Sequence, residues 1–124
     1  HDMAAKVKRL RPDWRVGLLV AKTLGNILTV PSDFVGIEAG MATVRFIRKA
    51  HRAGRDVYVW TVNDPAPALR TMSVGVDGLI SDRPALARLA VTRRAELSDA
   101  QRFLVALLVR LGTRIEVIAE EVRP

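Results

Sequence analysis

A short apolar run that ends at polar residues and a proline occurs twice in the middle of the chain. Residues 57–62 read V-Y-V-W-T-V, a β-branched and aromatic run of strand length, and Asn63-Asp64-Pro65 follows directly. Aspartate is favoured at the capping position of a helix and proline at its first position, where a missing N–H costs nothing. The segment 76–84, V-D-G-L-I-S-D-R-P, repeats the pattern. Alternating strands and helices with such short connections predict a parallel sheet covered by helices.

The rest of the chain is predicted to hold the same unit. Residues 16–20 form a continuous apolar run, which suits a strand buried on both faces of a sheet. A second strand is expected over 33–39, after a loop over 22–32 with room for one helical turn. Thr43 suits the cap of the next helix and Gly54 its left-handed end. The other expected elements are helices over 3–10, 65–75 and 84–97 and a last strand over 77–81.

The composition changes after residue 97. Ser98 and Gln101 fit the S-x-x-Q capping box, and the run 103–111 is apolar almost all round. A helix that is apolar on every side requires burial or a partner. A second capping box, T-x-x-E, begins a final helix over 113–124. We therefore expect two parts: an α/β part over 1–97 and a helical hairpin over 98–124.

Composition limits what the chain can be. Its 124 residues suffice for one domain with a core, and a hydrophobic share of 49% excludes a disordered chain. The absence of cysteine excludes a disulfide framework and a thiolate metal site. No apolar run reaches the roughly 18 residues that span a bilayer, and no signal peptide opens the chain. We expect a cytoplasmic or membrane-associated location.

The charge balance is basic, with 20 lysines and arginines against 13 acidic residues and a net charge of +7. Such a balance fits an anionic partner, such as nucleic acid, a lipid surface or a phosphate substrate. Aromatic residues make up 5%, without the basic-aromatic interleaving that favours base stacking. The sharpest basic feature is a stripe on one helix, which also fits a solvated outer face. It consists of Arg45, Arg48, Lys49 and Arg52.

No strong catalytic motif is present. The sequence lacks G-x-S-x-G, a P-loop, H-E-x-x-H and G-x-G-x-x-G. Carboxylates follow three of the expected strands, where active-site groups of parallel α/β folds gather. Asp64 is explained as a helix cap and Asp82 as part of the turn before a proline. Glu38 requires either a position facing a site or an ion pair with a basic neighbour. His51 has no second ligand at metal-site spacing, so we expect it to be structural.

The two central segments closely resemble the end of the glycerophosphodiester phosphodiesterase barrel. They pair W-T-V-N at 60–63 with G-V-D-G-L-I-S-D-R-P at 75–84. Upstream, residues 7–19 look like the family's fifth strand and the helix before it, and 46–54 like the helix before the seventh strand. The segment after residue 97 resembles the C-terminal extension of a bacterial subgroup, some members of which carry membrane-spanning segments.

The resemblance implies the C-terminal half of a (β/α)8 barrel, a fold that typically needs about 250 residues. Residues 1–97 would supply strands five to eight. The family's H-R-G, its E-x-D metal ligands, its second catalytic histidine and its E-x-K are absent, so no catalytic residue and no metal ligand can be assigned. The intact family enzyme is expected to use a divalent metal, Mg²⁺ or Ca²⁺, which steadies the phosphoryl charge.

Three residues are expected to line the substrate pocket. The resemblance implies that Trp60 and Asn63 line its glycerol side, although Trp60 also fits barrel packing. Glu38 is the third lining residue, at a position where relatives more often have a neutral residue. The implied reaction is hydrolysis of a glycerophosphodiester to glycerol phosphate and an alcohol.

Three functions remain open from the sequence. The first is a phosphodiesterase half that is inactive alone, with no nucleic-acid partner, and that requires a second copy or the N-terminal half of the barrel. The second is a non-enzymatic half-barrel that associates with itself as a scaffold. The third is a basic module that binds anionic lipid or nucleic acid. The resemblance leaves membrane attachment of the parent protein open.

Overall fold

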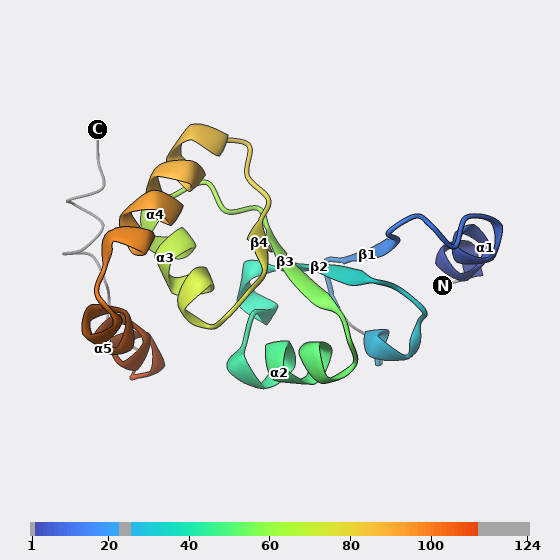
Figure 1. The fold of residues 1–124 in the computed structure, drawn as a ribbon, viewed down its shortest axis with the longest axis horizontal. Helices are drawn as coiled ribbons and strands as arrows, with labels where there is room; N and C mark the ends of the chain where they lie inside the picture. Colours follow the sequence, from blue (N-terminus) through green and yellow to red (C-terminus); the bar gives the residue numbers. More distant parts are fainter. Residues whose placement is uncertain (1, 23–25, 112–124) are drawn as a thin grey trace.

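The computed structural model describes residues 2–22 and 26–111 of the chain. Its centre is a four-stranded sheet in the order β1-β2-β3-β4 (Figure 1). The strands are β1 (Gly17–Val20), β2 (Phe34–Glu38), β3 (Asp56–Trp60) and β4 (Gly78–Leu79). The α-helices are α1 (Asp2–Leu10), α2 (Val44–Arg52), α3 (Pro65–Ser73), α4 (Pro84–Glu96) and α5 (Asp99–Arg110), and two 3-10 turns are η1 (Ile27–Thr29) and η2 (Ala39–Met41).

Every pair of neighbouring strands is parallel, which confirms the predicted fold class. The register joins Val35 to Val57 and Glu38 to Trp60 across β2 and β3. Sequential strands are neighbours throughout, and a helix follows each of the last three strands. Within the described residues, the outer strands β1 and β4 each pair on one side only. The last strand is shorter than predicted, because ladder pairing in β4 covers only Gly78–Leu79.

Local sequence signals account for most helix ends. The N–H of Phe46 donates to the hydroxyl of Thr43 at the start of α2, and Gly54 follows this helix with φ +69°. Ser98 and Gln101 form both bonds of the predicted capping box. The prediction for Asp64 is wrong in part: it occupies the capping position of α3, but its side chain accepts no capping hydrogen bond. Pro65 supplies the start of this helix by its fixed φ.

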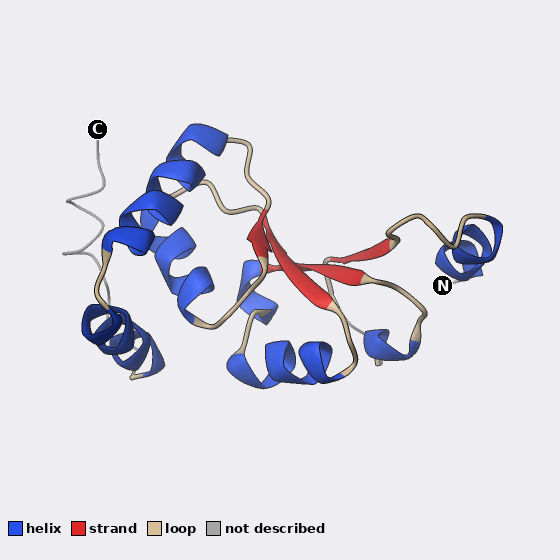
Figure 2. Cartoon of the chain, viewed as in Figure 1, coloured by secondary structure: helices blue, strands red, loops and turns tan. Residues whose placement is uncertain are grey.

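The core lies between the sheet and the helices that cover one of its faces (Figure 2). Alternate residues of β2 and β3 point into it, as the two-residue period of a strand requires. Helices α2 and α3 contribute the opposing layer. The fully buried side chains are Val35, Ile37, Ile47, Val57, Val59, Val62 and Leu69.

The opposite face of the sheet is not covered by helices in the described part of the chain. Leu19 on β1 is 70% exposed, and Ile80 just after β4 is also exposed. The prediction that residues 16–20 are buried on both faces is therefore wrong for this chain. The strand carries apolar residues on both faces, but the described residues provide a covering layer for only one.

The two outermost helices pack loosely. Met3 of α1 is 78% exposed, and a salt bridge of 2.8 Å between Lys8 and Asp33 ties this helix to the sheet. Helix α5 buries Val105 and packs against α3, while Phe103 is 72% exposed. The predicted final helix over 113–124 lies outside the described residues. The division of the chain at residue 97 stays a prediction.

Candidate functional site

The carboxyl ends of the parallel strands meet at one edge of the sheet. Glu38 ends β2 and Trp60 ends β3, and the two residues are directly in register. The backbone then pairs once more beyond the strands, because the N–H of Val62 donates to the carbonyl of Ile80 at 3.0 Å. Active-site groups of parallel α/β folds gather at such an edge. The predicted lining residues therefore lie in one region of the molecule.

Asn63 joins the two loops that leave β3 and β4. Its amide oxygen accepts hydrogen bonds from the N–H of Asp82 at 2.9 Å and from the hydroxyl of Ser81 at 3.1 Å. Its amide nitrogen donates to Asp82 Oδ2 at 3.1 Å. The Ser81 hydroxyl also accepts from the N–H of Arg83. These bonds fix the distance between the two loops and agree with a structural role for Asp82.

Trp60 lies half-buried on the sheet face that none of the described helices covers. Its Cδ1 would be 3.5 Å from a Cβ on Gly36, so the indole packs over the neighbouring strand. The indole Nε1 is buried and has no hydrogen-bond partner among the described residues. The peptide bond that links it to Thr61 is cis. The side chain thus combines sheet packing with an unused donor at the strand ends.

Glu38 is exposed at the start of the turn η2. No ion pair joins it to a basic side chain in residues 2–22 and 26–111. Because it is exposed, its charge is solvated and requires no such partner. Its part in lining a pocket stays a prediction.

His51 lies on the outer helix α2, away from the strand ends. Its Nε2 is 2.8 Å from Asp77 Oδ2, and the same oxygen accepts the N–H of Val57 at 2.7 Å. The contact ties α2 to the segment before β4, in agreement with the expected structural role. No signal in the sequence marks Asp77 for this role, because only the fold brings it to this helix.

Asp33 is a second structural carboxylate that no signal in the sequence marks. Lys8 donates to both of its carboxylate oxygens, at 3.0 and 2.8 Å, and the N–H of Val16 donates to Oδ2 at 2.7 Å. The hydrogen bond from Lys8, followed by that from Val16, lowers the pKa of this carboxyl. Asp33 therefore joins α1, β1 and β2 at the amino-terminal edge of the sheet, opposite the candidate site.

The described residues do not fit a metal site by themselves. They contain no group of three or more histidine, cysteine, aspartate or glutamate side chains close enough to hold an ion. Glu38 and Asp82 lie at the strand ends without a third ligand in the described part of the chain, and Asp82 is bound by Asn63. No described helix is long and apolar enough to span a membrane.

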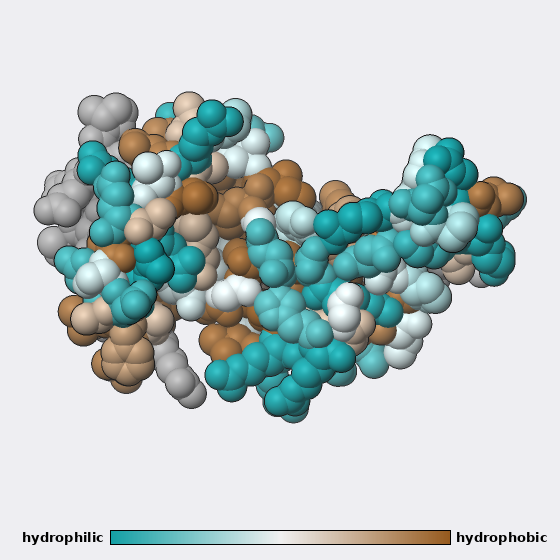
Figure 3. Space-filling model, in the orientation of Figure 1, coloured by the Kyte–Doolittle hydropathy of each residue, from teal (hydrophilic) through white to brown (hydrophobic). Residues whose placement is uncertain are grey.

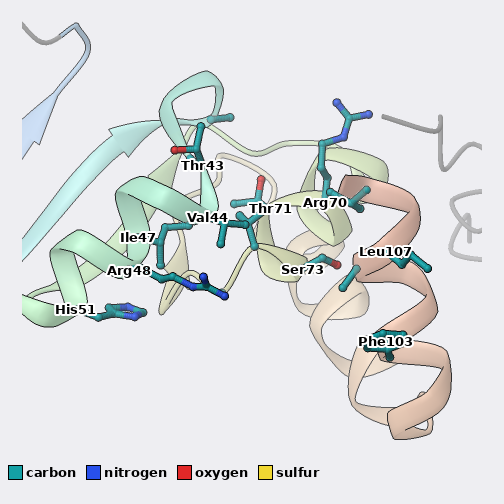
Figure 4. A pocket seen from close by; sticks show the side chains of 16 residues that line it. Thr43, Val44, Ile47, Arg48, His51, Arg70, Thr71, Ser73, Phe103 and Leu107 are labelled. Carbon is teal, nitrogen blue, oxygen red and sulfur yellow. The ribbon is translucent and has the colours of Figure 1, made fainter. Parts of the chain in front are cut away.

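A cavity of about 870 Å³ lies elsewhere, between α2, α3 and α5 (Figure 4). Its walls include Ile47, Arg48, Thr71, Phe103 and Leu107. It opens on the helical layer, so it is separate from the exposed face of the sheet that carries Trp60.

Comparison with known proteins identifies relatives for the part of the chain that contains the sheet. The sequence model of the "Glycerophosphoryl diester phosphodiesterase family" matches residues 8–86. "Probable glycerophosphodiester phosphodiesterase 2" of Mycobacterium tuberculosis is 35% identical over 75 residues, which cover 60% of this chain and 28% of the relative. "Glycerophosphodiester phosphodiesterase GDPD4" of Arabidopsis thaliana is 27% identical over 90 residues, covering 68% and 27%.

A solved structure supports the same fold. It is that of a protein from Silicibacter pomeroyi DSS-3 provisionally assigned as a glycerophosphoryl diester phosphodiesterase, with a TM-score of 0.67 and 20% sequence identity. The match covers 74% of this chain and 35% of that one. The chain thus spans about a third or less of each of these proteins.

Proposed function

The chain belongs to the glycerophosphoryl diester phosphodiesterase family, and on that premise we propose that it supplies the C-terminal half of a catalytic barrel that hydrolyses glycerophosphodiesters. Water would cleave the phosphodiester to glycerol phosphate and an alcohol. The chain would contribute strands five to eight of the barrel and one side of the substrate pocket. Alone it would be inactive.

The observation that carries this proposal is the arrangement at the carboxyl ends of the strands. Trp60 and Glu38 are in register there, and Asn63 holds the loops after β3 and β4 together. In (β/α)8 enzymes the loops at this end of the strands form the active site. A family match over residues 8–86 covers every strand that contributes to this edge.

Each lining residue has a different part in the proposal. The indole of Trp60 would form an apolar wall for the glycerol carbons, and its free Nε1 could donate to an oxygen. Asn63 would position the two loops, since its amide oxygen already accepts two hydrogen bonds. Glu38 would add a charged group at the rim. The acid–base residues and the carboxylates for Mg²⁺ or Ca²⁺ would have to come from the half of the barrel that this chain does not span, because its described residues do not form a metal site.

A chimera tests the proposal. Residues 8–86 of this chain would replace the aligned segment in the Mycobacterium tuberculosis relative, once that relative is confirmed to hydrolyse a glycerophosphodiester. The chimera should retain hydrolysis, and Trp60→Ala should lower kcat/KM by about tenfold or more, since a pocket wall would be lost. Trp14→Ala is the matched control, because Trp14 is exposed and lies outside the sheet. A chimera that folds as the relative does but has no activity would contradict the proposal.

The isolated chain provides the second test. It should show no turnover of glycerophosphodiesters above a buffer blank with Mg²⁺ or Ca²⁺ present. Turnover well above the blank that survives Trp60→Ala would refute the assignment of this chain as an inactive half.

A further inference from the structure

Helix α5 presents an exposed apolar stripe. Phe103, Leu104, Leu107 and Leu111 follow at intervals of one, three and four residues, which puts them on one side of the helix. All four are exposed. Val105 is the buried contact of this helix with the rest of the molecule. Contiguous apolar surfaces of this kind mark sites of protein or membrane interaction. We refer to the four exposed residues as the α5 stripe.

Helix α2 presents a cationic surface. Its nine residues include no aspartate or glutamate. Four of them are exposed lysine or arginine side chains that form no ion pair within residues 2–22 and 26–111. These α2 cations are Arg45, Arg48, Lys49 and Arg52. Helices α1 and α4 differ in part, because Lys8 of α1 and Arg93 of α4 have carboxylate partners.

The two surfaces meet at the cavity between the helices. Arg48 lines it from α2, and Phe103 and Leu107 line it from α5. Figure 4 shows the Arg48 side chain reaching into the space between the two helices. No aspartate or glutamate is among the described residues that line this cavity. In Figure 3 the surface over α5, at the lower left, is largely hydrophobic, and the surface over α2, at the lower centre, is largely hydrophilic. An anionic group in the cavity would meet positive charge on one side and apolar side chains on the other.

We propose that α2 and α5 together bind the surface of an anionic lipid leaflet. The α5 stripe enters the boundary between head groups and acyl chains, and the α2 cations face the anionic head groups. Interfacial helices combine these two terms, buried apolar area and attraction to anionic lipid. The cavity at Arg48 gives one head group room between the helices.

Charge complementarity decides in favour of lipid over other occupants. A nucleic acid would use the α2 cations but would leave the α5 stripe in water, because a phosphate backbone offers no apolar surface. A second copy of this chain would bring the same positive charges together, and like charges in an interface repel. An anionic leaflet offers head groups to the α2 cations and acyl chains to the α5 stripe at the same time. The proposal does not depend on the hydrolytic function, because its test measures binding.

The test is sedimentation of the full chain with vesicles of phosphatidylcholine, with and without phosphatidylglycerol, at physiological salt. We expect binding only with phosphatidylglycerol, and a loss of binding as salt rises, because salt screens exposed charges. The double variant Arg45→Glu/Arg48→Glu should lower the partition coefficient by about tenfold or more. Arg88→Glu/Arg93→Glu on α4 changes the net charge equally and should lower it by less than about threefold, since these residues lie outside the surface.

A second pair of variants tests the apolar part. Leu104→Ser, 54% exposed, should weaken binding several-fold, whereas Val91→Ser on α4, 50% exposed, should leave it unchanged. Both sites are half in water, so the variants are expected to keep the thermal transition of the parent chain. Equal binding to both kinds of vesicle, binding that does not depend on salt, or equal losses from the α2 and α4 variants would overturn the proposal. So would binding to DNA without binding to vesicles, or a chain whose α5 stripe proves to be the contact of a dimer.

Discussion

The ring of Tyr58 lies across the backbone of Gly78 on the neighbouring strand, so closely that a Cβ on this glycine would be 2.5 Å from Cδ1 of the ring. The same relationship recurs between Phe34 and Gly17. The rings of Tyr58 and Phe34 meet edge to face, with centroids 5.2 Å apart. The sheet face that no described helix covers is therefore built of large side chains set over glycines, as in the layered interior of a closed barrel.

We expect Gly78→Ala to destabilise the chain by about 1–3 kcal/mol, because the added methyl group overlaps the ring of Tyr58. Urea unfolding at a fixed protein concentration measures the change. Gly40→Ala is the matched control, since a Cβ there meets no atom within 4 Å. The double variant Gly78→Ala/Tyr58→Ala should show a favourable coupling between the two sites. If the free-energy losses of the two single variants simply add in the double variant, the overlap between the added methyl group and the Tyr58 ring is not the cause of the destabilisation.

We expect Asn63→Ala to cost about 1–3 kcal/mol, because the N–H of Asp82 and the hydroxyl of Ser81 lose their acceptor. Asp64→Ala serves as the control. A capping aspartate usually contributes about 1 kcal/mol, but this side chain makes no capping bond, so its loss should change the unfolding free energy by less than about 0.5 kcal/mol. Equal losses for both variants would contradict the roles that the structure gives to these neighbours.

Most of the fold could be predicted because its signals are local. The strand–proline joints at 57–65 and 76–84, the cap at Thr43 and the capping box at Ser98 each depend on residues a few positions apart, and the structure has these elements in place. The order of strands then follows from the preference of parallel sheets for adjacent crossovers. The coarse family assignment came from the same two joints.

Long-range contacts could not be predicted from the pattern. The sequence predicts Asp33 and Asp77 only as the first residues of the strands over 33–39 and 77–81. Their roles depend on Lys8 and His51, which lie 25 and 26 residues away in sequence. The exposed face of β1 was missed for a different reason. The apolar residues of this strand predict that both faces of the sheet are covered by other side chains. They do not indicate whether the elements that cover the second face belong to the same chain.

The salt bridge between Lys8 and Asp33 should make stability depend on pH. The hydrogen bond from Lys8 lowers the pKa of this carboxyl in the folded chain. A lowered pKa adds stability that is fully present above the unfolded value, about 4, and is lost as the pH falls through the folded value. We expect Asp33→Asn to lower the unfolding free energy by about 1 kcal/mol at neutral pH. The difference from the parent chain should shrink steadily as the pH falls below about 4.

Urea midpoints measured across this pH range provide the check. Asp13→Asn is the control, because among the described residues the Asp13 side chain bonds only to Arg11, two residues away, and joins no separate elements. Its effect should be smaller at every pH. A constant difference between Asp33→Asn and the parent chain down to acid pH would mean that the carboxylate charge does not stabilise the joint.

The uncovered face and the two outer strands should make the isolated chain associate. The edges of β1 and β4 offer unpaired backbone groups, and Leu19 and Ile80 offer apolar surface beside them. Two copies would bring together eight strands, the number in a closed barrel of this type. Light scattering coupled to size exclusion should therefore give a mass of a dimer or larger, above the 13.7 kDa of one chain.

Leu19→Lys should shift the mass toward the monomer, because an ammonium group on this face opposes burial. Val91→Lys on α4 is the control and should leave the mass unchanged. A monodisperse monomer with a cooperative thermal transition would show that the chain is stable with this face in water, and the association of half-barrels would be abandoned.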